Sequence, residues 1–346
     1  MIDPAENLRF AVAVCIIHDF EDLLACPFEG FFFAREYVVV HSDCDHAMEA
    51  SVKKQLLRDA IGRSQCDCLV MTQAEARARF LETIDSPDEE IDLAEACLWI
   101  SAEANEGLTP EPYCEKLDGL AESVRAEIEP TTSVADRTAL LNEHLFLEHG
   151  YRGNENEYYD PQNSYLDCVI DRKTGIPISL AILWMSVAQR VGIPAYGVGF
   201  PGHFLVGVET DPAIFVDAFS AVVLTAQDCE ERLRAIAGDE VKFSPAMLAP
   251  STRRQTLARV LRNLKQIHIR SSNFADAVAC IDRILALDPD NPNELRDRGV
   301  LHRSLECWSF AREDLERFVE IAPTSPDVKN IELILDELRV RTAHIH

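Results

Sequence analysis

A close pair of cysteines is the first place where residue types and spacing suggest chemistry. Cys66 and Cys68 are separated by one aspartate, and Cys44, Asp45 and His46 lie upstream as further candidate metal ligands. Zinc prefers thiolate, imidazole and carboxylate ligands, but this spacing is not that of a zinc-finger knuckle. We therefore expect no metal and no cofactor, and a site built from Cys44, Cys66 and Cys68 stays an alternative.

Four short motifs in the middle of the chain carry a more specific signal. They are Asn163-Ser164-Tyr165-Leu166, Gly175-Ile176-Pro177-Ile178-Ser179-Leu180-Ala181, Gly199-Phe200-Pro201-Gly202-His203-Phe204 and Val216-Asp217-Ala218-Phe219. In this combination they resemble the transglutaminase-like superfamily. More narrowly they resemble its bacterial SirB-type branch, in which the domain precedes tetratricopeptide repeats. The resemblance covers about residues 76–340.

The resemblance implies an acyl-transfer site that has lost its nucleophile. In catalytic members a cysteine at the start of the central helix attacks an acyl group, a histidine takes its proton, and an aspartate orients the histidine. With Gly175 and Ala181 fixing the register of the pattern Gly-x-Cys-x-x-x-Ala, His203 matches the base and Asp217 the orienting acid. Pro177 falls on the nucleophile position, so the covalent mechanism fails at its first step.

Three substitutes for the nucleophile stay open. Ser179 lies two positions further along the helix, which rotates it about 200° away. Cys168 lies nine residues before Pro177 on a segment that could fold back over the site, where His203 would activate the thiol. His203 and Asp217 could also activate water directly, although no oxyanion donor is evident. We expect instead a vestigial dyad, in which the two side chains keep only a structural hydrogen bond.

The spacing of the dyad makes a geometric prediction. Strands are expected at about 203–207 and 213–217, with the turn at residues 210–212. The midpoint of His203 and Asp217 is Thr210, so a loop at about 208–212 would place the two side chains directly opposite each other on one face. A two-residue turn would not.

The elements that must position these residues are mostly helical. Four segments carry an apolar stripe at helical spacing and predict a small helical layer. They span residues 75–82, 92–104, 113–129 and 133–149. Residues 177–191 are apolar almost all round, so this helix should be buried on several sides, with Pro177 at its first position and Gly192 after its end.

The C-terminal part of the chain repeats itself. A shift of 34 residues matches Phe274 with Trp308, Ala277 with Ala311, Ile281 with Leu315 and Pro289 with Pro323. This period is typical of tetratricopeptide repeats, whose concave surface receives a peptide or a partner helix. Lys265 replaces the small residue that Gly299 provides in the second unit, and residues 327–342 should form a capping helix. Alternatively, two repeats could merely buttress the central domain.

Composition limits the choice of partners. The chain has 59 acidic residues against 33 Lys and Arg, a net charge of -26 that would repel nucleic acid and an anionic membrane. One predicted helix holds a basic stretch, which we interpret as a solvated face: Arg253, Arg254, Arg259, Arg262 and Lys265. Eleven scattered cysteines and an N-terminus without a basic start predict reduced thiols and a cytoplasmic location.

These observations predict an α+β fold of three parts. Residues 1–75 form a mixed α/β segment of unknown role, with strands at 10–17 and 31–40 and a helix at 47–61. The other parts are residues 76–250, a helical layer with a transglutaminase-like (papain-like) α+β domain, and 251–346, an all-α segment of tetratricopeptide repeats with a capping helix.

The expected function is a noncatalytic scaffold for protein interaction or regulation, with a protein or peptide bound through the repeats and neither nucleic acid nor membrane as partner. The alternative is a thiol-dependent amidase, protease or acyltransferase that uses Cys168, His203 and Asp217.

Overall fold

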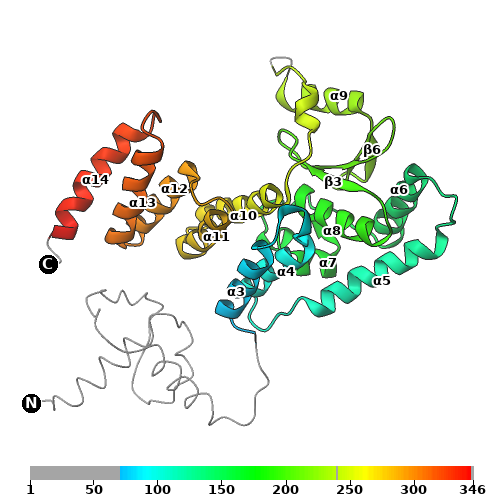
Figure 1. The fold of residues 1–346 in the computed structure, drawn as a ribbon, viewed down its shortest axis with the longest axis horizontal. Coiled ribbons are helices and arrows are strands. Elements are labelled where there is room, and N and C mark those ends of the chain that lie inside the picture. Colours follow the sequence, from blue (N-terminus) through cyan, green and yellow to red (C-terminus); the bar gives the residue numbers. More distant parts are fainter. Residues whose placement is uncertain (1–70, 239–240, 344–346) are drawn as a thin grey trace, which may run out of the picture.

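The computed structural model describes residues 71–238 and 241–343. The strands expected at 10–17 and 31–40, the helix expected at 47–61 and the cysteine pair lie outside these residues. Within the described part, helices dominate and one small antiparallel sheet lies near the middle of the chain (Figure 1). The predicted α+β fold followed by an all-helical segment is confirmed.

The N-terminal helical layer begins where the sequence places helix caps. Thr72, Asp92 and Ser133 each accept a hydrogen bond from a backbone N–H of the first turn that follows them. The layer consists of α3 (Gln73–Ile84), α4 (Leu93–Ala104), α5 (Glu111–Glu127) and α6 (Val134–Asn142), which continues into a π-helical turn η4 (Glu143–Glu148). Short 3-10 turns lie at η3 (Asp88–Glu90), η5 (Pro161–Asn163) and η6 (Pro245–Leu248).

The buried centre of the molecule is α8 (Pro177–Arg190), which begins at its proline as predicted. Every residue from Pro177 to Ala188 is buried. Helix α7 (Leu166–Arg172) and a short parallel pair, β1 (Arg152–Gly153) with β2 (Thr174–Gly175), lead into it. Pro177, which the motif aligns with the nucleophile, therefore lies at the start of a helix that is enclosed by its neighbours.

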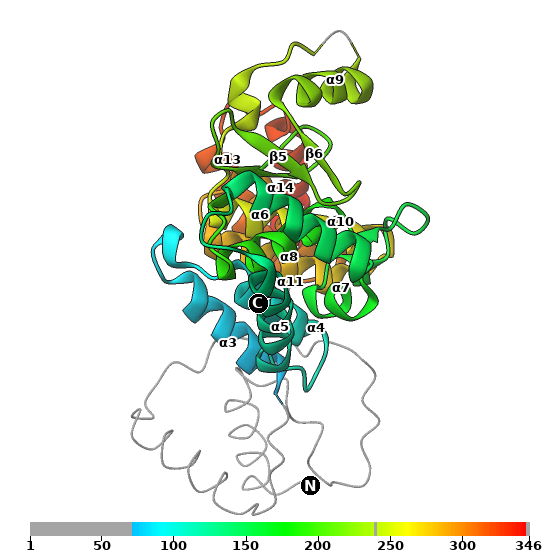
Figure 2. The same cartoon turned by 90° about the vertical axis from the view of Figure 1, so that its right-hand side faces the viewer.

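A four-stranded antiparallel sheet packs on α8. Its strands run in chain order: β3 (Ala195–Val198), β4 (Leu205–Val208), β5 (Ile214–Asp217) and β6 (Val222–Leu224). Val206 and Val216 belong to the core that contains α8, whereas Leu205 and Phe215 pack with Leu233 of α9 (Ala226–Ala237). The sheet is thus held between α8 and α9, as Figure 2 also shows.

The C-terminal segment consists of two helix pairs and a capping helix, as the 34-residue repeat predicts. Its helices are α10 (Arg253–Arg270), α11 (Phe274–Leu287), α12 (Pro292–Ser304), α13 (Trp308–Ile321) and α14 (Val328–Ala343). Leu257, Leu261 and Ile284 of the first pair belong to the same core as α8. The other face of α11, with Ile281 and Leu285, packs with the second pair and α14 in a second core. Among the described helices, none is long and apolar enough to cross a membrane.

Candidate functional site

His203 lies in a tight loop between β3 and β4. Gly202 has a positive φ of 68°, and the backbone N–H of His203 donates to Phe200 O at 3.0 Å. The guanidinium of Arg259, on α10, donates to His203 O at 2.7 Å and to Phe200 O at 3.3 Å. The first repeat helix therefore holds the loop that carries the histidine.

Asp217 ends β5 and is fully buried. His203 Nε2 lies 2.8 Å from Asp217 Oδ1, which also accepts hydrogen bonds from the backbone N–H groups of Phe219 (3.0 Å) and Ser220 (3.2 Å). Arg232 of α9 forms an ion pair with the other carboxylate oxygen. Both oxygens of this carboxylate are therefore satisfied by protein groups.

The environment of Asp217 keeps its carboxyl group ionised. Burial alone would raise its pKa. The hydrogen bond and charge of His203, the charge of Arg232 and the Ser220 contact outweigh burial and hold the pKa of Asp217 at about 2. The dyad is thus a charged, fully bonded cluster inside the protein.

Arg232 is a member of the site that sequence reasoning missed. Its Nη1 also lies 3.4 Å from His203 Nε2. Strand alternation places Asp217 on the same sheet face as Phe215, which is the face that α9 covers. One signal in the sequence could have indicated this role. Arg232 is adjacent to Leu233 and three residues after Cys229, so it borders the buried stripe of the amphipathic helix α9. A charged side chain at such a position needs a partner of opposite charge.

The hairpin register differs from the expected one by two residues. Val206 pairs with Val216, so continuing the register places Asp217 opposite Leu205 rather than opposite His203. The loop at residues 209–213 extends one residue beyond the expected end, because β5 begins at Ile214. A shift of two keeps every side chain on its face, so His203 still reaches Asp217 diagonally from the end of β4.

Pro177 has no reactive side-chain atom, and the hydroxyl of Ser179 makes hydrogen bonds with backbone groups. Pro177 is the first residue of α8. Ser179 Oγ accepts from Ile176 N at 3.1 Å and lies 2.6 Å from Asn163 O, in a side chain that is 2% exposed. The rotation of Ser179 away from the nucleophile position thus directs it to the Asn163 segment.

Cys168 lies on α7, which packs against α4, α5 and α8. Its thiol makes a hydrogen bond with Asp167 Oδ2 at 3.5 Å, and no hydrogen bond or ion pair within the described chain joins it to His203. Burial, together with the charge and hydrogen bond of Asp167, raises the pKa of Cys168 to about 12. This environment suppresses the thiolate that a nucleophile requires.

A polar pocket of about 650 Å³ lies beside the dyad. The ring of Phe219 contacts the backbone at Gly153 and packs edge-on against His203, with ring centroids 6.1 Å apart. The pocket is lined by Arg152, Gly153, Asn154, Glu155, Asn156, Arg172, Thr174, Phe219 and Ser220. It therefore opens beside β1 and β2, the pair that leads into α8.

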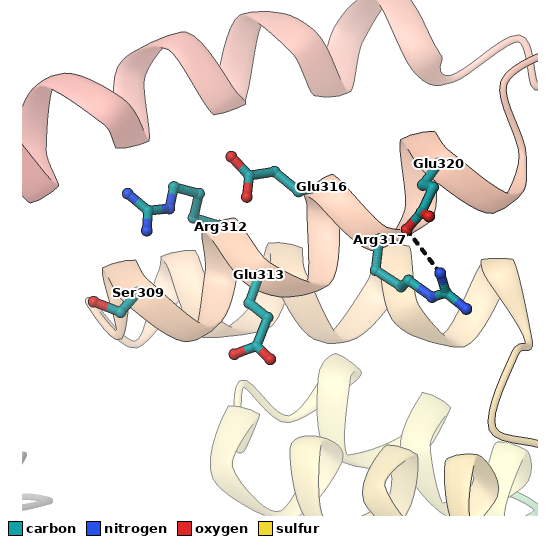
Figure 3. Close-up of a pocket in the computed structure, with 6 residues that line it drawn as sticks. All are labelled: Ser309, Arg312, Glu313, Glu316, Arg317 and Glu320. Carbon is teal, nitrogen blue, oxygen red and sulfur yellow. Dashed lines mark hydrogen bonds and ion pairs between the residues drawn. The ribbon is translucent and has the colours of Figure 1, made fainter. Parts of the chain in front are cut away.

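A second pocket, of about 430 Å³, lies on α13 in the repeats (Figure 3). Arg317 pairs with Glu320 at 2.7 Å and with Asp290 at 3.0 Å. The pocket is lined by Ser309, Arg312, Glu313, Glu316, Arg317 and Glu320. These are polar side chains of one helix face, with no buried polar group among them.

The interpretation of the basic stretch on α10 as a solvated face is wrong. Arg254 donates to Ser86 O at 3.1 Å, so it binds the helical layer. Arg262 and the buried Lys265 both contact Glu294 of α12 at 2.7 Å. These side chains join α10 to neighbouring elements because it lies between the helical layer and the second repeat. The residues of the alternative metal site, Cys44, Cys66 and Cys68, fall outside the described residues, and inside them no group of three metal-binding side chains occurs.

Comparisons with known proteins match both parts of the chain. The family model described as "Transglutaminase-like superfamily" matches residues 111–262, and one described as "Tetratricopeptide repeat" matches residues 264–336. A UPF0162 protein of Xylella fastidiosa is 38% identical over 271 residues, which are 77% of this chain and 96% of that protein. A UPF0162 protein of Pseudomonas aeruginosa is 30% identical over 72% of this chain and 92% of its own length.

Among solved structures, that of menin superposes with a TM-score of 0.43 at 10% identity, over 73% of this chain and 62% of menin.

Proposed function

Because the chain belongs to the UPF0162 family, the SirB-type branch in which a transglutaminase-like domain precedes tetratricopeptide repeats, we propose that it is a noncatalytic cytoplasmic scaffold that binds a partner protein. The observation that carries the proposal is the start of α8, where Pro177 occupies the place of the nucleophile. A proline ring provides neither a proton to remove nor an atom to attack an acyl group.

Two of the three substitutes, Ser179 and Cys168, are engaged elsewhere, which supports the proposal. Ser179 is buried and bonded to Ile176 and Asn163. Cys168 has a raised pKa and contacts Asp167 instead of His203. The His203–Asp217 pair then serves as a structural connection between the loop before β4, the end of β5 and α9.

Binding of a protein partner is the second part of the proposal, because stacked helix pairs commonly present a surface for peptides or helices. The second repeat exposes apolar side chains at Val300 and Phe310, which are 37% and 52% exposed. The first repeat is committed to the core around α8, so we assign the partner surface to the second repeat.

Thiol labelling tests the noncatalytic part directly. Limiting iodoacetamide is applied at neutral pH to the native protein, to His203→Ala and to Pro177→Cys, and the labelling rate of each cysteine is read by mass spectrometry. We expect Cys168 to label slowly and equally with and without His203. Pro177→Cys is the matched control, because it places a thiol where catalytic relatives carry one.

The thiol-dependent amidase, protease or acyltransferase is the alternative. Rapid labelling of Cys168 that slows in His203→Ala would favour this enzyme and contradict the noncatalytic proposal.

The partner surface is tested separately. Immobilised protein should retain partner proteins that the variants Val300→Glu and Phe310→Glu fail to retain, whereas the variant Val340→Glu on α14 should retain them. Equal retention by all variants would remove the second repeat as the partner surface.

A further inference from the structure

An arginine that has no side-chain partner among the described residues lies at the edge of the polar pocket beside the dyad. Among the arginines of residues 71–238 and 241–343, Arg152 is the one whose side chain makes no hydrogen bond, ion pair or ring contact. This is unexpected in a chain with 59 acidic residues and 33 basic ones, where internal carboxylates are plentiful. Within the described part of the chain, no group competes for its guanidinium, which can bind a further acceptor.

A second arginine, Arg172, lines the same pocket and has N–H donors that no described residue accepts. Arg172 contacts Asp160 and Gln162, each at 2.8 Å, and both contacts use Nη1. Its Nε and Nη2 therefore have no partner in the described chain, while its position is fixed by the two contacts. Two guanidinium groups around one pocket provide the forked donor geometry that binds carboxylates in pairs of hydrogen bonds.

The remaining lining adds neutral donors and one apolar wall. The amide of Asn156 makes no hydrogen bond among the described residues and lines the pocket, as does Ser220, which contacts Asp217. Phe219 forms the wall, and its ring packs 6.3 Å from Tyr158, which in turn lies 5.3 Å from Tyr159. Exposed aromatic surface thus continues from the pocket toward Arg270, which lies 4.0 Å from the Tyr159 ring.

We propose that this pocket binds a carboxylate of a peptide segment of a partner protein, with Arg152 and Arg172 on the carboxylate and Phe219 against the adjacent apolar side chain. The proposal rests on the proposed noncatalytic function and deepens it, because it gives the transglutaminase-like domain its own binding site. A carboxylate fits better than a phosphate: Glu155 also lines the pocket and would repel a doubly charged group more strongly.

The test measures the binding of short fluorescent peptides to the full chain by anisotropy. Three probes share the sequence Gly-Gly-Ala-Phe-Leu: one with a free C-terminal carboxylate, one with a C-terminal amide, and one amidated after an added Glu. We expect the amidated probe without Glu not to bind. Stronger binding of the probe with a free C-terminus identifies a terminal carboxylate as the ligand, and stronger binding of the probe with the added Glu identifies a side-chain carboxylate. Arg152→Ala should weaken binding about tenfold or more.

The controls separate this site from general charge and from folding. Arg79→Ala removes another exposed arginine, one that pairs with Glu82 on α3, and should bind like the native protein. Arg172→Ala should weaken binding as Arg152→Ala does, and circular dichroism should show the native helix content for both. The proposal is overturned if the native protein binds none of the probes or if Arg152→Ala binds them as tightly as the native protein does. It is also overturned if a peptide that carries phosphoserine binds more tightly than the carboxylate probes.

The fate of the peptide distinguishes the two proposals. A peptide that is recovered unchanged by mass spectrometry but does not bind overturns only the carboxylate site. A peptide that is cleaved or becomes attached to the protein overturns the noncatalytic function.

Discussion

At the scale of residues, the His203–Asp217 pair is placed as a structural bond would be. The carboxylate has no exposed surface and is shared among an imidazole, a guanidinium and two backbone N–H groups. A catalytic aspartate mainly needs to hold its histidine, whereas this one also anchors α9 through Arg232. The pair can therefore persist without a nucleophile, because removing either member leaves buried polar groups without partners.

The pKa of Asp217 makes its contribution to stability dependent on pH. Because the pKa is lowered from 3.8 to about 2 in the folded protein, the stabilisation is complete above pH 4 to 5 and is lost as pH falls toward 2. We expect Asp217→Asn to reduce the free energy of unfolding by about 2 kcal/mol at pH 7. The difference from the native protein should shrink below about pH 4 in urea unfolding curves measured at several pH values.

An exposed carboxylate provides the comparison for this measurement. Glu230→Gln removes an ion pair with Arg234 on the surface of α9 and should change the free energy of unfolding by less than about 1 kcal/mol at any of these pH values. A deficit of Asp217→Asn that is constant from pH 7 to pH 3 would contradict the role assigned to the ionised carboxylate.

The hydroxyl of Ser179 should matter to stability rather than to chemistry. Its loss in Ser179→Ala leaves the buried N–H of Ile176 without that acceptor and should lower the free energy of unfolding by about 1 to 3 kcal/mol. Ser186→Ala, on the same helix, removes only a bond to Ile182 O and should have the smaller effect in thermal unfolding. Equal losses of stability in the two variants would show that the hydrogen bonds of Ser179 contribute no more than the single bond of Ser186.

Sequence reasoning found the dyad but not its surroundings. The motifs identified His203 and Asp217, and their spacing placed them on one face of a hairpin. The two-residue register error arose because loop length depends on tertiary contacts, here the bond from Glu209 N to Pro194 O. Arg232 lies 15 residues after Asp217 and Arg259 lies 56 residues after His203, and no local pattern links either arginine to the dyad.

At the scale of elements, Gly299 shows how closely the two helices of the second repeat approach. A Cβ atom at this position would lie 2.6 Å from Leu315 Cγ and 3.2 Å from Ala311 O. Gly299→Ala should therefore destabilise the protein by about 1 to 3 kcal/mol, although alanine is the better helix former. Denaturant unfolding followed by circular dichroism measures this change.

Gly119 is the matched control, because it lies exposed on α5 and a Cβ there would have no atom within 4 Å. Gly119→Ala should stabilise the protein by about 0.5 to 1 kcal/mol through helix propensity alone. If both substitutions stabilise, α12 and α13 can separate without penalty, and the close approach is not what requires the glycine.

Helices were easier to predict than strands for a physical reason. Caps and apolar stripes are local, so the bounds of α4 and α8 follow from Asp92 and Pro177. Strands β3 and β6 were not expected, because a short strand is defined by pairing with a neighbour rather than by its own pattern.

At the scale of the whole molecule, a buried ion pair joins the helical layer to the repeats. Glu103 of α4 is 5% exposed and contacts Arg283 of α11, which is 6% exposed, while Arg77 approaches the same carboxylate at 2.7 Å. Glu103→Ala leaves the guanidinium of Arg283 buried without compensation and should lower the free energy of unfolding by about 3 kcal/mol. Urea unfolding monitored by tryptophan fluorescence tests this expectation.

Replacing both charges distinguishes the pair from simple packing. The double variant Glu103→Met with Arg283→Met fills the same space with apolar atoms and should recover most of the loss, because a buried pair contributes little over a well-packed apolar substitute. A double variant as unstable as Glu103→Ala would mean that the interface requires charge, for instance to bind a water molecule.

The boundary between the two repeats determines where this protein could gain or lose length. The seam between the repeats combines ion pairs with apolar packing. Lys265 and Arg262 of α10 contact Glu294 of α12, and Arg298 contacts Asp282. Ile281 of α11 and Leu295 of α12 belong to one apolar core. Further repeats that reproduce both these charges and the apolar contacts could be inserted there, in evolution or by engineering, while the dyad stays intact. The same change before α10 would take Arg259 away from the loop of His203.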